Sequence, residues 1–86
     1  MISIVIPIFN EERSITKTID KINTVLSNQK IEYEIITVND GSRDRTHSLL
    51  KERNDIILIS RTKNRGYGFS LKEGIKKSIG SHILIN

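Results

Sequence analysis

The 86-residue chain contains no cysteine, no alanine and no tryptophan, and only one proline. Without cysteine it can form neither a disulfide nor a thiolate metal site, and a reducing compartment is compatible with it. Its first apolar run, residues 2–8, is too short to cross a bilayer and lacks a basic leader. We therefore expect this run to be neither a signal peptide nor a membrane helix.

Isoleucine is the residue that the chain has in excess. Seventeen of its 31 hydrophobic residues are Ile, whose β-branched side chain favours strand interiors over helices. A chain of this length forms at most one small domain, which buries roughly 60–65% of its unfolded surface. The composition predicts a buried sheet in a chain too short to be a complete two-substrate enzyme.

Basic residues outnumber acidic ones by 14 to 10, which gives a net charge of +4. The excess lies largely between residues 43 and 77 and suits a ligand that carries phosphate. A solvated basic surface explains the same numbers equally well. The charge alone selects neither nucleic acid nor a membrane, and we expect no nucleic-acid partner.

Hydrophobic periodicity predicts four strands separated by three helices. The strands are expected at residues 2–6, 33–38, 56–59 and 82–85. Helices are expected at residues 11–27, with acids in the first turn, at residues 44–53, and after residue 68, with Leu71, Ile75 and Ile79 on one face and Gly80 as a left-handed C-cap. The βαβαβαβ order predicts an α/β fold, a Rossmann-like parallel sheet with helices on both faces.

Ligands of such sheets bind beyond the carboxyl ends of the strands, which here are followed by the loops 7–12, 39–44 and 60–68. In the second loop Asp40 could accept hydrogen bonds from a base or a ribose, and Gly41 would let a ligand approach the backbone. The alternative is that Asp40 or Ser42 caps the second helix.

In the first loop Phe9 could stack on a nucleobase and Glu11 could accept a hydrogen bond from the base or sugar, while Pro7 would stiffen the chain. Ordinary core packing is the alternative for Phe9, and the commoner role of an aromatic side chain. The absence of glycine between the first strand and the first helix argues against a nicotinamide or flavin cofactor.

In the third loop the amides before the third helix, together with Arg61, Lys63 and Arg65, could hold a diphosphate, although two glycines also suit a tight turn. His47 and His82 have no neighbouring metal-ligand residues in the sequence. Structural or surface roles are therefore expected for both.

Three segments, taken in order, resemble the family 2 glycosyltransferases of the GT-A fold. They are residues 5–12 (VIPIFNEE), residues 33–46 (YEIITVNDGSRDRT) and residues 64–68 (NRGYG), with Gly74 beyond. The resemblance implies a UDP- or GDP-sugar donor, with Pro7, Phe9 and Glu11 around the base and ribose and Asp40 on the base. Phe9 stands where the family often has Tyr, and Asn39 where it commonly has a first Asp.

The resemblance also implies what the chain lacks. The family's Asp-x-Asp motif, which binds Mg²⁺ or Mn²⁺, would follow Asn86, so no metal site and no catalytic residue is expected within residues 1–86. The chain is interpreted as the nucleotide-sugar-binding part of a larger enzyme, incomplete and inactive alone.

The intact enzyme is expected to be inverting, to act on a lipid-phosphate or saccharide acceptor, and to be cytoplasmic or at the cytoplasmic face of a membrane. An exposed last strand is expected to favour oligomers. The alternative function is a stand-alone nucleotide-binding or regulatory module of the same fold.

Overall fold

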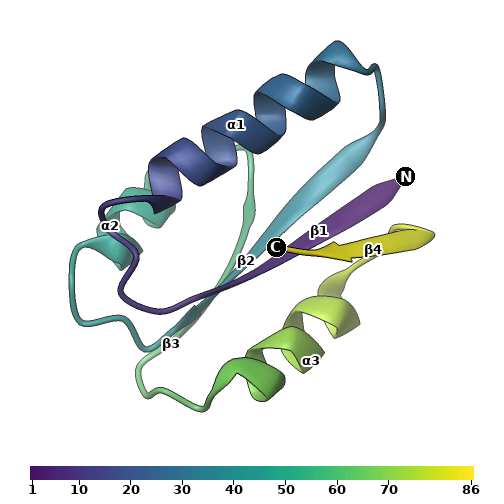
Figure 1. Ribbon diagram of the computed structural model, residues 1–86. Coiled ribbons are helices and arrows are strands. Elements are labelled where there is room, and N and C mark those ends of the chain that lie inside the picture. Colours follow the sequence, from purple (N-terminus) through teal and green to yellow (C-terminus); the bar gives the residue numbers. More distant parts are fainter.

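A computed structural model describes residues 1–86 and contains the predicted alternation of strands and helices (Figure 1). In chain order the elements are β1 (Ile2–Ile8), α1 (Ile15–Asn28), β2 (Tyr33–Asp40), α2 (Thr46–Lys51), β3 (Ile57–Arg61), α3 (Tyr67–Lys77) and β4 (His82–Ile85). None of the helices has the combination of length and apolarity that is needed to cross a membrane.

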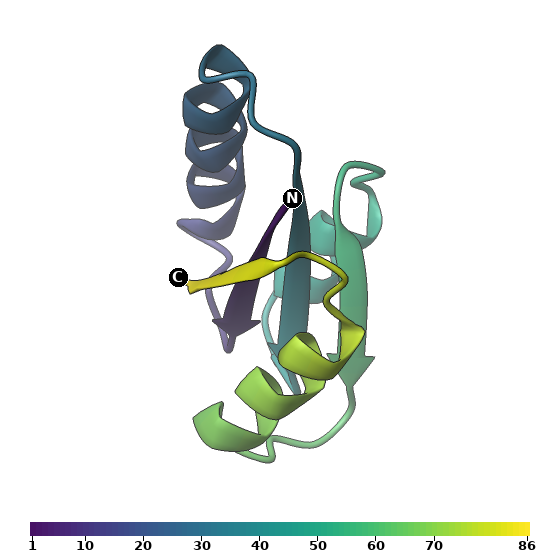
Figure 2. The same cartoon turned by 90° about the vertical axis from the view of Figure 1, so that its right-hand side faces the viewer.

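The four strands form one parallel sheet in the order β3-β2-β1-β4. The helices α1 and α3 lie on opposite sides of this sheet (Figures 1 and 2). Right-handed crossovers explain the arrangement, because the chain steps outward from β1 to β3 and then reverses to reach β4 on the other side of β1. The register places Ile8 beside Asn39 and Asp40 beside Arg61, so the carboxyl ends of β1, β2 and β3 meet at one edge.

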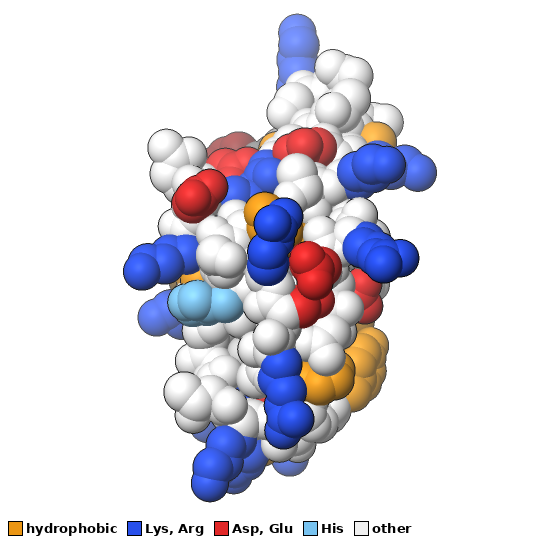
Figure 3. Space-filling model, turned by 90° about the vertical axis from the view of Figure 1, so that its left-hand side faces the viewer, with side chains coloured by type: hydrophobic (Ala, Val, Ile, Leu, Met, Phe, Trp, Pro, Cys, Tyr) orange, Lys and Arg blue, Asp and Glu red, His pale blue; other side chains and the backbone are white.

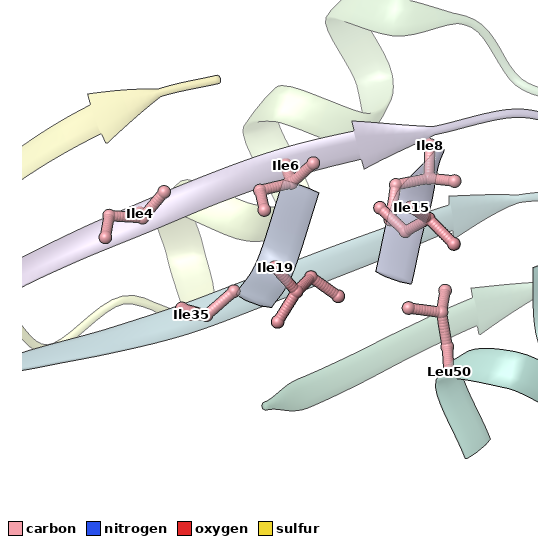
Figure 4. Close-up of a cluster of buried hydrophobic side chains, with 7 residues drawn as sticks. All are labelled: Ile4, Ile6, Ile8, Ile15, Ile19, Ile35 and Leu50. Atoms are coloured by element: carbon pink, nitrogen blue, oxygen red, sulfur yellow. The ribbon is translucent and has the colours of Figure 1, made fainter. Parts of the chain in front are cut away.

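The main core fills the space between the sheet and the helices α1 and α2 (Figure 4). Alternate residues of β1 point into it, as the two-residue period of a strand requires. The seven buried members of the cluster are Ile4, Ile6, Ile8, Ile15, Ile19, Ile35 and Leu50. Six of the seven are isoleucines, four on the strands β1 and β2 and two on α1, so the sheet is buried as the Ile excess predicts.

The other face of the sheet is covered by α3, which packs through small residues. Ser70 and Gly74 are the buried residues of this helix. A Cβ atom at Gly74 would lie 2.3 Å from Cγ1 of Val5, so the helix axis comes closer to β1 than a larger residue would allow. The expected apolar face is only partly buried. Leu71 is half-buried, but Ile75 is 43% exposed because α3 contacts the sheet through Ser70 and Gly74. Ile79, which lies beyond the end of α3, is 78% exposed.

Two helix ends also differ from expectation. The first helix begins at Ile15, one turn later than residue 11, and has no acid in its first turn. Gly80 is not a left-handed cap, because α3 already ends at Lys77 and only Gly41 and Gly66 among the glycines have positive φ. A Cβ atom at Gly80 would lie 2.5 Å from the Ser3 hydroxyl, so glycine is needed there for a close approach to β1.

Candidate functional site

The loop after β1 is joined to the loop after β2 by hydrogen bonds in both directions. The backbone N–H of Asn10 donates to the Ser42 hydroxyl at 2.9 Å, and the Arg43 N–H donates to the Asn10 side-chain oxygen at 2.8 Å. Asn10 has a φ of 52°, in the left-handed region that asparagine tolerates better than most residues. Residues 42 and 43 therefore fix the course of the chain immediately after β1.

The next two amides of the first loop are held in the same way. Glu11 donates its N–H to the Thr46 hydroxyl at 2.9 Å, and Glu12 donates its N–H to Oδ2 of Asp44 at 3.2 Å. Asp44 also accepts the N–H of Thr46 at 2.9 Å. These amides lie in the turn before α1, which starts at Ile15, and that turn is fastened to the second loop.

The pKa of Asp44 lies below its ordinary value. Partial burial raises this pKa, but hydrogen bonds from Thr46 and from the Glu12 amide lower it by more. The Asp44 carboxylate, which accepts the Glu12 amide of the first loop, is therefore ionised at neutral pH. Sequence reasoning missed this role, and its only signal was the alternation of Ser42, Asp44 and Thr46, whose side chains readily bond free backbone amides.

A cavity of ≈ 380 Å³ opens at the carboxyl ends of β1 and β2. It is lined by Pro7, Ile8, Phe9, Glu11, Asp40, Asn64, Gly66, Tyr67 and Ser70. All four residues singled out from the sequence, Pro7, Phe9, Glu11 and Asp40, are thus brought to one cavity. A neighbouring cavity of ≈ 510 Å³ shares Phe9 and Asn64 with it. The ring of Phe9 is 45% exposed, so core packing is not its role.

Asp40 is the most strongly bonded residue of this cavity. It is 4% exposed, and its Oδ1 accepts from the Arg65 N–H at 2.8 Å and from Nε and Nη2 of Arg61 at 3.1 and 2.7 Å. Its Oδ2 accepts from the Gly66 N–H at 2.8 Å. A carboxylate has about four acceptor positions, two on each oxygen. Oδ2 therefore retains capacity for one more donor.

The bonds of Asp40 also fix its charge. Burial raises the pKa of its carboxyl, but the amides of Arg65 and Gly66 and the guanidinium of Arg61 together bring that pKa below its ordinary value. The alternative of a cap for the second helix is wrong for both candidates: Asp40 binds amides that precede α3, and Ser42 binds Asn10. The first amide of α2, that of Thr46, is instead accepted by the Asp44 carboxylate.

The third loop does not form the diphosphate site that the sequence predicts, because the Arg61 side chain and the amides before α3 already bind other groups of the protein. The Arg61 guanidinium is committed to Asp40, to Glu73 and to the Ser70 hydroxyl, the last at 2.6 Å. The amides of Arg65 and Gly66 are occupied by Asp40. An internal carboxylate thus takes the anion position at the start of α3. Of the expected diphosphate site, only the side chains of Lys63 and Arg65 remain outside these bonds, and the Arg65 guanidinium lies 4.7 Å from the centre of the Phe69 ring.

Gly41 allows the second and third loops to come into close contact. Its φ is +71°, and a Cβ atom there would lie 2.6 Å from the backbone nitrogen of Asn64. Glycine is therefore needed here for the close contact with the third loop, and Gly41 also lines the 510 Å³ cavity. Asn64 fastens this contact by donating its side-chain N–H to the carbonyl of Asp40 at 3.1 Å.

Asn39 joins the ends of β2 and β3. Its buried amide donates to the Ser60 hydroxyl at 3.1 Å, and Nδ1 of His47 lies 2.8 Å from the same hydroxyl. This bonding is consistent with a structural role for His47, while His82 lies exposed on β4. No three His, Asp or Glu side chains come together in an arrangement that could hold a metal ion.

On the face that Figure 3 shows, the basic charge is not gathered into one patch. Figure 3 views the face formed by α2 and the carboxyl-end loops, and the Lys and Arg side chains are spread over it among acidic ones. A larger cavity of ≈ 560 Å³ lies away from these loops, between α1 and β4, and most of its lining is apolar.

Residues 3–86 match the model of the glycosyl transferase family 2. The chain is 37% identical to the uncharacterized glycosyltransferase YkcC of Bacillus subtilis (strain 168), over 96% of this chain and 27% of that protein. It is 39% identical to the undecaprenyl-phosphate 4-deoxy-4-formamido-L-arabinose transferase of Pseudomonas fluorescens, over 78% and 21%. It is 34% identical to the poly-beta-1,6-N-acetyl-D-glucosamine synthase of Staphylococcus aureus, over 96% and 20%.

Solved structures show the same fold. Residues 1–349 of TarS from S. aureus superpose with a TM-score of 0.80 and 25% identity, over 99% of this chain and 26% of that one. The mannosyltransferase PcManGT of Pyrobaculum calidifontis, solved with GDP-Man and Mn²⁺, gives a TM-score of 0.79 and 22% identity, over 95% and 25%. The chain spans about a quarter of the length of these proteins. Its sequence and its four-stranded parallel sheet together establish that it belongs to glycosyl transferase family 2, with the GT-A fold.

Proposed function

We propose that this chain provides the donor-recognising part of a glycosyltransferase that uses a nucleoside-diphosphate sugar, either a UDP- or a GDP-sugar. The observation that carries the proposal is the 380 Å³ cavity at the strand ends, which is lined by an aromatic ring and by two carboxylates from different loops. Its place beyond the carboxyl ends of parallel strands is where open α/β sheets bind ligands. The complex of PcManGT with GDP-Man supports a donor of this class.

Each residue has a role that its surroundings allow. The half-exposed ring of Phe9 is available to stack on the base, and the free acceptor position on Oδ2 of Asp40 can take a base N–H. Glu11, whose Oε2 accepts the Ser14 hydroxyl at 2.9 Å, can accept a ribose hydroxyl with its other oxygen. Pro7 fixes the backbone beneath the ring.

The transfer itself is proposed as a single inverting displacement onto a lipid-phosphate or saccharide acceptor, in the cytoplasm or at the cytoplasmic face of a membrane. The two relatives named for an undecaprenyl-phosphate transferase and a polysaccharide synthase support these acceptor classes. The residues present do not fit Mg²⁺ or Mn²⁺, because they form no metal-binding group. We therefore assign no step of the reaction to a metal held by this chain.

The test is an NMR titration of the 86-residue chain with UDP and with GDP. Amide shifts centred on Phe9, Glu11 and Asp40, saturating at millimolar nucleotide or below, are expected. Inorganic diphosphate and the free nucleosides serve as comparison ligands that separate recognition of the phosphates from recognition of the base. Shifts that follow diphosphate alone, or no response to either nucleotide at millimolar concentration, would contradict the proposal.

A further inference from the structure

Asn10 stands at the centre of the contact between the first two loops without lining the 380 Å³ cavity itself. It lies between Phe9 and Glu11, which both line that cavity. Its backbone and its side chain are each bonded to the second loop, so a reciprocal pair of bonds surrounds this one residue. The direction in which Phe9 and Glu11 leave the backbone is therefore set at Asn10.

The positive φ of Asn10 is a second indication that its conformation is set by the contact between the loops. A φ of 52° is uncommon for a residue other than glycine, and strained backbone of this kind persists only where the surrounding structure determines it. Here the determining contacts are the Ser42 hydroxyl and the Arg43 amide. The chain reversal that they hold ends β1 and turns the next residues across the mouth of the cavity.

The two following amides extend the same contact. Three successive N–H groups, those of Asn10, Glu11 and Glu12, all donate to side chains within residues 42–46. None of them is used by α1, which starts at Ile15. A loop with every one of these donors fixed by another element has little freedom to reorient. The first loop is held as one unit against the second.

We propose that Asn10 is a positioning residue for nucleotide binding, which acts by locking the first loop onto the second and so holding Phe9 and Glu11 in place before a nucleoside diphosphate arrives. This inference rests on the proposed function. The nucleotide binds more tightly because Phe9 and Glu11 are already ordered in the free protein, so less conformational entropy is lost on binding. In this role Asn10 acts through Phe9 and Glu11, which line the 380 Å³ cavity; Asn10 itself lines only the neighbouring 510 Å³ cavity.

Three substitutions separate the two properties of Asn10. Asn10→Asp keeps both the tolerance of positive φ and an acceptor for the Arg43 amide. Asn10→Gly keeps the backbone freedom but removes that acceptor, and Asn10→Ala removes both. Asn54→Gly is the matched control, because Asn54 is exposed in the turn before β3 and far from the loops.

The measurement is the Kd of each variant for UDP and for GDP by titration calorimetry, at a temperature where urea unfolding shows every variant to be folded. Asn10→Asp and Asn54→Gly should bind within about threefold of the unaltered chain. Asn10→Gly should bind about tenfold more weakly, as expected for the loss of one well-made hydrogen bond, and Asn10→Ala more weakly still. Amide hydrogen exchange at residues 9–12 should become faster in the Gly and Ala variants.

The outcomes are distinguishable. Equal Kd values for folded Gly, Ala and unaltered chains would overturn the role of Asn10 and leave the proposed function standing. Weak binding by folded Asn10→Asp would also overturn this role, because that variant keeps the acceptor for the Arg43 amide and the tolerance of positive φ. Absence of binding by the unaltered chain would overturn the proposed function and this inference together.

Discussion

At the scale of single residues, Asp40 shows how one side chain can serve both the fold and the site. Its buried carboxylate collects Arg61 and the amides of Arg65 and Gly66, and so fixes the loop before α3 to the end of β2. The same carboxylate keeps one acceptor position at the cavity. Substitution of Asp40 therefore changes stability and binding together, and binding must be measured on folded protein.

Asp40→Asn should lower the free energy of unfolding by roughly 3 kcal/mol. Removing one partner of a buried ion pair costs about 3–5 kcal/mol, and the lower end applies because Glu73 still contacts Arg61. Urea unfolding followed by circular dichroism is the measurement, with the exposed Glu52→Gln as control. A variant as stable as the unaltered chain would show that Asp40 does not hold the loop.

The difference in free energy of unfolding between Asp40→Asn and the unaltered chain should become smaller as the pH falls. The folded-state pKa of Asp40 lies below the ordinary value of 3.8, so its stabilising contribution is fully present above that value. It is lost as the pH falls through the folded-state pKa. Unfolding measured from pH 7 to pH 2 should therefore show the gap between Asp40→Asn and the unaltered chain closing below about pH 4. A constant gap would contradict this.

Phe9→Ala should weaken UDP or GDP binding by about 1–3 kcal/mol, the usual worth of an aromatic ring stacked on a base. Stability should change little, because the ring is 45% exposed. Val25→Ala is the matched control, since Val25 is a comparably exposed apolar residue on α1. Titration calorimetry on all three proteins decides, and equal affinities would remove Phe9 from the proposed site.

At the scale of secondary structure, the strands could be predicted and the packing of α3 could not. Runs such as residues 2–8 are apolar enough to predict a strand whatever surrounds them, and the turns at residues 39–42 predict where β2 ends. The buried face of α3 depends on the close approach that Gly74 permits, which a count of apolar positions does not register. The turn before α1 is bonded to side chains more than 30 residues away, which local sequence patterns do not register either.

Gly74→Val should destabilise the protein by about 1–3 kcal/mol, because a Cβ at this position already overlaps Val5 and overpacking forces the helix outward. Gly68→Ala is the control within the same helix. Nothing lies within 4 Å of a Cβ there, and alanine favours helix over glycine by about 0.5–1 kcal/mol. Thermal unfolding of both variants should shift in opposite directions.

At the scale of the whole molecule, the meeting of three loops could be predicted because parallel strands end at one edge of the sheet. Which of their polar groups bond to one another could not. The partners of Asp40 and Asn10 lie 21 to 33 residues away, and they are chosen by side-chain geometry at close range. The sequence predicts which loops meet, but the hydrogen bonds that join these loops are seen only in the structure.

The outer edge of β4 should make the 86-residue chain associate as its concentration rises. Ile83, Leu84 and Ile85 are 39%, 51% and 44% exposed, and the strand carries no Lys, Glu or Pro to discourage pairing. Leu84→Lys should shift the chain toward monomer in sedimentation velocity. Tyr67→Lys, which adds the same charge on α3, should not. Monomeric unaltered chain at high concentration would contradict the prediction.

The position of β1 also governs the order in which the fold can be completed. This strand is central, paired with β2 on one side and with β4 on the other, and its second partner is the segment His82–Ile85. The segment His82–Ile85 must therefore emerge from the ribosome before β1 has both of its neighbours. Until then β1 is paired on one side only, with β2, and its other edge is open to solvent.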